Sequence, residues 1–162
     1  MENNHYVLDA NVFLEYIYGR PLKSHSQQLI KDAILKKITI LIPSLLLDEV
    51  TEVLCGNLDN VEDVQKHLKY IEHLAKEEVI SIIVPNCDVR MKAIEIARTG
   101  NSKSGYPELT DSLYHALAIL NGAVFITNDK KHVSKVKQFG HIQKLSNIQA
   151  EITEPSAALD RE

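Results

Sequence analysis

Short apolar segments alternate with longer amphipathic segments along most of this 162-residue chain. Predicted strands, rich in Val, Ile and Leu, are His5–Leu8, Thr39–Ile42, Val79–Val84, Val124–Thr127 and His141–Leu145. Segments of helical length and period are Gln27–Lys37, Ser44–Cys55, Val61–Glu78, Asp88–Thr99, Asp111–Leu120 and Lys130–Phe139. This alternation predicts an α/β fold, a short, mainly parallel twisted sheet with helices on both faces. Such folds bind ligands beyond the carboxyl ends of their strands.

Length and composition limit the class of protein. We expect one domain at residues 1–150, followed at 151–162 by an acidic tail or a short terminal helix. A hydrophobic fraction of 44% with 25% charged residues excludes wholesale disorder. The chain has neither an apolar run of membrane-spanning length nor a secretory signal pattern, and Cys55 and Cys87 form no motif. These features predict a cytoplasmic protein without a membrane role.

Two acidic residues follow predicted strands. Asp9 comes directly after the first strand, and Asp129 comes just after the strand that ends near Thr127. Either could simply cap the next helix, and Asn11 is also placed to cap the helix after Asp9. Because parallel strands end at one edge of the sheet, the two acids are also candidates for a shared site.

Two further acids lie on predicted helices. Asp111 opens its helix, where the helix dipole alone could favour it unless Thr110 supplies the cap. On the helix at Ser44–Cys55, Glu49 borders the apolar arc, whereas Asp48 and Glu52 point further toward solvent. A carboxylate at the border of a buried face is partly desolvated and needs a partner, so Glu49 is the candidate on this helix.

Four converging carboxylates would repel one another unless a hard cation neutralised them. Mg²⁺ or Mn²⁺ suits an all-oxygen donor set, and the scattered histidines offer no zinc site. His115 lies one turn after Asp111 and could reach this site or serve in packing. A carboxylate-held metal indicates phosphate chemistry, with Asp9, Glu49, Asp111 and Asp129 as catalytic and metal-binding candidates.

Four segments resemble the PIN-domain ribonucleases, most closely the VapC-type toxins of bacterial toxin–antitoxin systems. The segments are VLDANVFL from Val7, IPSLLLDEVTEVL from Ile42, LTDSLYHALA from Leu109 and FITNDKKH from Phe125. They occur in the family's order, and each contains one of the four candidate acids. The chain departs from a typical toxin in its length after Ala150 and in its loop at Gly100–Pro107.

The resemblance implies a three-layer α/β/α domain with an Mg²⁺- or Mn²⁺-binding acidic pocket. It also implies endonucleolytic RNA cleavage by metal-activated water, leaving a 5′-phosphate, together with a homodimer and a cognate antitoxin whose tail enters the pocket. Asn11 and Thr127 match supporting polar positions of the family.

The net charge of −4 argues against a broadly basic nucleic-acid-coating surface but allows local contacts. Lys130 and Lys131 are the candidate RNA contacts beside Asp129.

Other functions are weighed against this hypothesis. A non-toxin or catalytically silent PIN domain, acting in RNA processing or as a binding scaffold, is the main alternative. A phosphohydrolase using an aspartyl-phosphate at Asp9 usually has a second aspartate where this chain has Asn11. A receiver domain needs a phosphoacceptor aspartate after the middle strand, whereas Pro85 and Asn86 follow Val84.

Overall fold

The sheet consists of five parallel strands in the computed structural model, which describes residues 4–149. The strands are β1 (His5–Leu8), β2 (Thr39–Pro43), β3 (Ile80–Ile83), β4 (Val124–Thr127) and β5 (Ile142–Lys144). Their order across the sheet is β3-β2-β1-β4-β5, so β1 is central. After β1 the chain adds β2 and then β3 on one side of it. The chain then returns to the other side of β1 and adds β4 and β5. The carboxyl ends of β1 and β4 therefore form the switch point at which α/β folds bind ligands.

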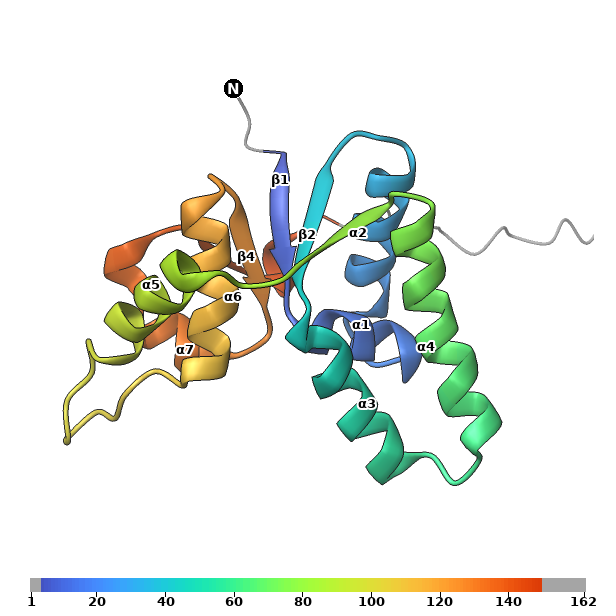
Figure 1. Ribbon diagram of the computed structural model, residues 1–162, viewed down its shortest axis with the longest axis horizontal. Helices are drawn as coiled ribbons and strands as arrows, with labels where there is room; N and C mark the ends of the chain where they lie inside the picture. Colours follow the sequence, from blue (N-terminus) through green and yellow to red (C-terminus); the bar gives the residue numbers. More distant parts are fainter. Residues whose placement is uncertain (1–3, 150–162) are drawn as a thin grey trace, which may run out of the picture.

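Seven α-helices and two 3₁₀-helices connect the strands within residues 4–149. The helices are α1 (Ala10–Ile17), α2 (Lys23–Ile34), α3 (Leu45–Asn57), α4 (Val61–Lys76), α5 (Cys87–Ala97), α6 (Leu109–Leu120), α7 (Lys130–Lys135), η1 (Lys137–Phe139) and η2 (Leu145–Asn147). Figure 1 shows α1 to α4 on one side of the sheet and α5, α6 and α7 on the other. The predicted three-layer α/β/α architecture is confirmed.

The core lies between the sheet and these two helical layers. Val7, Leu8 and Ile126 are completely buried in the two central strands. On the α6 side, the rings of Tyr114 and Phe125 stack with their centroids 5.6 Å apart. None of the helices described in residues 4–149 is long and apolar enough to span a membrane. The predicted tail at 151–162 lies outside the described residues.

The structure corrects several predicted helix boundaries. The helix after β1 begins at Ala10 with Asp9 at its N-cap position, so Asn11 is not the cap. Glu108, not Thr110, occupies the N-cap position of α6. The helix predicted at Lys130–Phe139 divides into α7 and η1, because Val136 leaves the helical conformation. Helix α2 begins at Lys23, four residues before the predicted start.

Candidate metal centre

The four candidate acids come from four elements that meet at the carboxyl edge of the sheet. Asp9 and Asp129 precede α1 and α7, Asp111 lies in the first turn of α6, and Glu49 lies in α3. In Figure 1 this edge is the open end between α3 and α6. Asp9 interacts electrostatically with each of the other three, so the fold brings all four together.

Asp9 is the most deeply buried of the four, with 3% of its surface exposed. Its Oδ2 accepts a hydrogen bond of 2.7 Å from the Thr127 hydroxyl. The Thr127 oxygen in turn accepts one of 3.0 Å from the Asp129 backbone amide. Burial raises the pKa of Asp9, whereas the Thr127 hydroxyl and the backbone amides of Asn11 and Ala10 act to lower it. Thr127 therefore contacts Asp9 through its side chain, and Asn11 does so through its backbone amide.

Asp111 and Asp129 form an interacting pair of carboxyl groups. Burial, the charges of Asp9 and Asp129 and a side-chain hydrogen bond with Asp129 raise the pKa of Asp111 to about 8. Burial acts to raise the pKa of Asp129 too, but hydrogen bonds leave that pKa below its usual value. Its Oδ1 accepts from the backbone amides of Lys131 and His132 at 2.9 and 3.0 Å. Asp129 therefore caps α7 and also contacts Asp111, and this contact favours the protonated form of Asp111.

Glu49 is half-buried, whereas Asp48 and Glu52 on the same helix are exposed, as the helical arrangement predicts. Burial and the charge of Asp9 raise the pKa of Glu49 to about 7, although the Tyr114 hydroxyl acts to lower it. The Oε1 atom of Glu49 and the Tyr114 hydroxyl are both buried without a hydrogen-bond partner of good geometry among residues 4–149. An unsatisfied buried oxygen of this kind is suited to a ligand.

The donor chemistry fits a hard divalent cation. All four side chains offer carboxylate oxygens, the ligands that Mg²⁺ and Mn²⁺ prefer. Burial and, after it, their mutual repulsion raise the pKa values of Glu49 and Asp111, and a bound cation would counter the repulsion. Within residues 4–149, however, no three acidic, histidine or cysteine side chains already stand close enough to hold an ion.

Two clefts open beside these acids. The first, of about 430 Å³, includes Glu49 and Thr110 and also Arg90 on α5. The second, of about 410 Å³, includes the neighbours of Asp129 in sequence, Asn128 and Lys130. Lys131 is exposed on the same turn of α7.

The structure also places residues that the sequence left open or did not single out. His115 is buried, and its Nε2 lies 2.7 Å from the Gly140 carbonyl oxygen, which confirms its packing role. Tyr114 at Glu49 was not predicted. Its position three residues after Asp111, one turn along the same helix, was the available signal.

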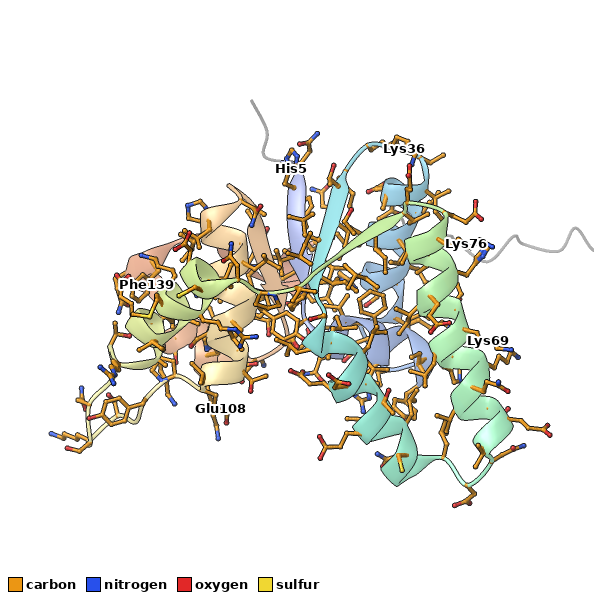
Figure 2. All side chains as sticks on the ribbon, in the orientation of Figure 1. His5, Lys36, Lys69, Lys76, Glu108 and Phe139 are labelled. Atoms are coloured by element: carbon orange, nitrogen blue, oxygen red, sulfur yellow. The ribbon has the colours of Figure 1, made fainter. Side chains whose placement is uncertain are left out.

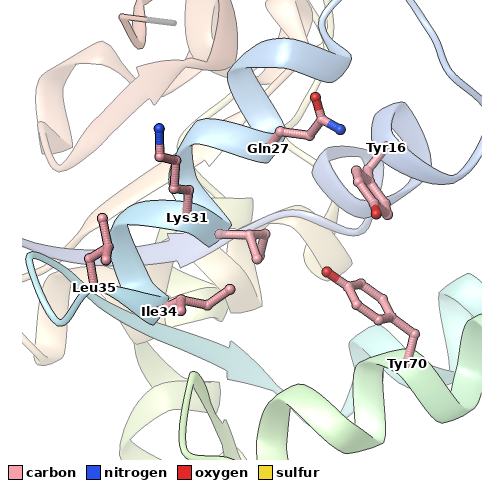
Figure 3. Close-up of a pocket in the computed structure, with 7 residues that line it drawn as sticks. Tyr16, Gln27, Lys31, Ile34, Leu35 and Tyr70 are labelled. Carbon is pink, nitrogen blue, oxygen red and sulfur yellow. The ribbon is translucent and has the colours of Figure 1, made fainter. Parts of the chain in front are cut away.

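A third cleft lies away from the acids, between α2 and the tyrosines of α1 and α4. It measures about 440 Å³ and includes Ile34 and Leu35, which are 54% and 53% exposed (Figure 3). Tyr16 and Tyr70 stack with their ring centroids 5.7 Å apart at its edge. Exposed aliphatic and aromatic side chains in one cleft indicate a surface that can bind an apolar segment.

Comparisons with known proteins agree with this architecture. The model of the PIN domain family matches residues 6–138. A comparison with curated proteins finds no match. The fold is similar to VapBC2 from Rickettsia felis bound to a DNA fragment from its promoter, with a TM-score of 0.65 and 21% identity over 86% of this chain and 98% of that one.

Two further solved structures have a similar fold. VapBC-1 from nontypeable Haemophilus influenzae has a TM-score of 0.63 at 16% identity, covering 88% of this chain and 98% of that one. DNA-bound VapBC from Salmonella typhimurium has a TM-score of 0.63 at 15% identity, covering 87% and 98%. The family match spans most of the sequence and contains all four acids. The chain therefore belongs to the PIN domain family.

Proposed function

We propose that the protein is a divalent-metal-dependent endoribonuclease and the toxin of a toxin–antitoxin pair. The convergence of Asp9, Glu49, Asp111 and Asp129 at one edge of the sheet carries the proposal. Membership of the PIN domain family and the similarity to VapBC structures support it.

Each acid has a distinct proposed task. Asp9, Asp111 and Asp129 would hold Mg²⁺ or Mn²⁺, and Glu49 would bind the metal or orient the attacking water. When bound, the cation would activate water and offset charge on the phosphoryl oxygens. Without a cation, burial and the charge of Asp9 raise the pKa of Glu49 to about 7, and a bound cation would favour its ionised form. Thr127 fixes the orientation of Asp9, and Lys130 and Lys131 would contact the RNA backbone.

A cleavage assay tests this function. Total cellular RNA is incubated with the wild type in Mg²⁺, Mn²⁺ or EDTA, and with Asp9→Asn in parallel. We expect discrete cuts with 5′-phosphate ends that require metal and that Asp9→Asn reduces by at least about 10²-fold. The matched control is Asp59→Asn, because Asp59 is exposed and lies before α4, outside the site. If metal-loaded, partner-free protein leaves RNA intact, the silent or scaffolding PIN domain becomes the better interpretation.

The proposed partner is an antitoxin protein, as in the VapBC complexes that share the fold. The cleft around Ile34 and Leu35 provides a surface for it, distinct from the acids. We expect co-expression of the neighbouring gene's product to prevent growth arrest by the wild type. The Ile34→Glu variant should still arrest growth when that product is co-expressed, and it should cleave RNA normally.

Sedimentation of the isolated protein would test the proposed homodimer separately.

A further inference from the structure

A basic groove lies at the carboxyl edge of β4 and β5, next to the acids. It is the cleft of about 410 Å³ described above, and its residues are Glu15, Pro21, Leu22, Asn128, Lys130, Lys144 and Ser146. Asn128 Nδ2 donates a hydrogen bond of 3.0 Å to Glu15 Oε1, and the Leu22 amide donates one of 3.0 Å to Glu15 Oε2. Because both oxygens of Glu15 are occupied in this way, the wall is fixed by hydrogen bonds.

Two ammonium groups share this groove. Lys144, at the end of β5, is half-buried, and Lys130, at the start of α7, is exposed. Across residues 4–149, neither side chain forms an ion pair or a hydrogen bond with another residue. The two ammonium groups outnumber the one carboxylate of the groove, that of Glu15, so the groove keeps a net positive charge that a bound anion would offset. This local positive charge contrasts with the net charge of −4 of the whole protein.

The groove is placed one strand away from the proposed reaction centre. Lys144 pairs in register with Thr127, whose hydroxyl donates to Asp9. Asn128 and Lys130 lie immediately before and after Asp129. An anion in the groove would therefore lie beside the acids, along the same edge of the sheet.

We infer that the groove of Lys130 and Lys144 binds a backbone phosphate of single-stranded RNA next to the phosphodiester that is cut. This inference rests on the proposed ribonuclease function and adds Lys144 as a substrate-binding residue. It also gives the RNA a direction across the molecule, from the acids toward β5. The two lysines position the strand and take no part in the chemical step.

Binding and cleavage are measured separately to test the inference. The probe is a fluorescein-labelled ten-nucleotide oligouridylate, and binding is followed by anisotropy in the Asp9→Asn background over a range of salt concentrations. Lys130→Gln and Lys144→Gln should each weaken binding about tenfold. The double variant Lys130→Gln/Lys144→Gln should also reduce the slope of log affinity against log salt by about 0.7, the value for one phosphate contact with a single strand. In the cleaving protein, KM should rise with little change in kcat.

The matched control is Lys36→Gln, which removes the same charge at the opposite edge of the sheet. Figure 2 shows Lys36 beside the start of β2, far from Glu108 at the site edge. Equal losses of RNA affinity in all three single variants would contradict the proposed phosphate site. Unchanged binding in Lys130→Gln and Lys144→Gln would also contradict it. If the wild type cuts no RNA but the binding losses follow the prediction, the ribonuclease proposal fails and the groove stands. If the Asp9→Asn protein does not bind the probe at all, the groove is wrong whatever the cleavage assay gives.

Discussion

Thr127 connects two of the candidate acids through a single hydroxyl group. It donates to the Asp9 carboxylate at 2.7 Å and accepts from the Asp129 amide at 3.0 Å, and it is completely buried. Its contact lowers the pKa of Asp9 against the effect of burial. Loss of this hydroxyl would therefore affect both the position and the ionisation of the site.

Thr127→Val tests this connection with a side chain of nearly the same shape. We expect unfolding free energy to fall by about 1–3 kcal/mol, because a buried carboxyl group and a backbone amide each lose a partner. The pKa of Asp9 should rise further, so the cleavage rate should reach its plateau at a higher pH than in the wild type. Thr127→Ser, which keeps the hydroxyl, is the control. An unchanged pH–rate profile in Thr127→Val would contradict this role.

The acids were predictable from sequence because their positions follow from local rules. Asp9 and Asp129 each follow a short apolar run, and Glu49 borders the buried face of α3. The bond between Thr127 and Asp9 spans 118 positions, and only the pairing of β1 with β4 creates it. The lysine pair was missed for the same reason, because Lys130 and Lys144 meet only when β5 joins β4.

At the scale of elements, the five strands were predicted and several helix ends were not. Helix α1 has only eight residues, and its sequence, ANVFLEYI, is buried along most of its length, so no polar face marks its period. Apolar residues around Val136 continued the pattern of α7 into η1. In both cases tertiary packing, which local propensity does not contain, decides the boundary.

The turn that leads into α6 depends on a close backbone contact at Gly100. Asn101 and Gly105 form an antiparallel bridge, with amide-to-carbonyl distances of 3.2 and 2.8 Å. A Cβ atom at Gly100 would overlap the carbonyl oxygen of Gly105 and the Cα of Tyr106. Because these are backbone atoms, the turn itself would have to move.

Gly100→Ala should therefore lower the unfolding free energy by about 1–3 kcal/mol. Chemical denaturation would measure this loss. Gly56→Ala is the matched control, because nothing lies within 4 Å of a Cβ there and the residue is helical. That substitution should instead stabilise the protein by up to about 1 kcal/mol. Equal stability of Gly100→Ala and the wild type would show that the turn rearranges without cost.

For the whole molecule, the raised pKa values predict how stability depends on pH. Asp111 and Glu49 have pKa values of about 8 and about 7, against ordinary values of 3.8 and 4.5. Between the ordinary and raised values the folded protein binds more protons than the unfolded chain does. Below about pH 6.5 the lowered pKa values of the buried His115 and His132 act in the opposite direction, so in EDTA the melting temperature should fall as the pH rises from roughly 6.5 to 8. Asp111→Asn should flatten this dependence, and a steeper fall in that variant would contradict the assignment.

A bound metal ion should raise the melting temperature. Mg²⁺ or Mn²⁺ at a hundred times its Kd should stabilise the protein by about 2.7 kcal/mol, because the cation binds the folded site. The melting shift should be larger at pH 8 than at pH 6, since the ligands must lose their protons. Asp111→Asn should remove most of the shift, whereas Asp59→Asn should keep it.

The strand order has a consequence for synthesis on the ribosome. The central strand β1 emerges first, but its second neighbour, β4, begins at Val124. A nascent chain that ends before β4 has β1 paired on one side only and lacks both Thr127 and Asp129. The proposed reaction centre is therefore assembled only after β4 and the start of α7 have left the exit tunnel. Under the proposed ribonuclease function, a nascent chain is therefore unable to cut RNA until β4 and Asp129 have emerged from the ribosome.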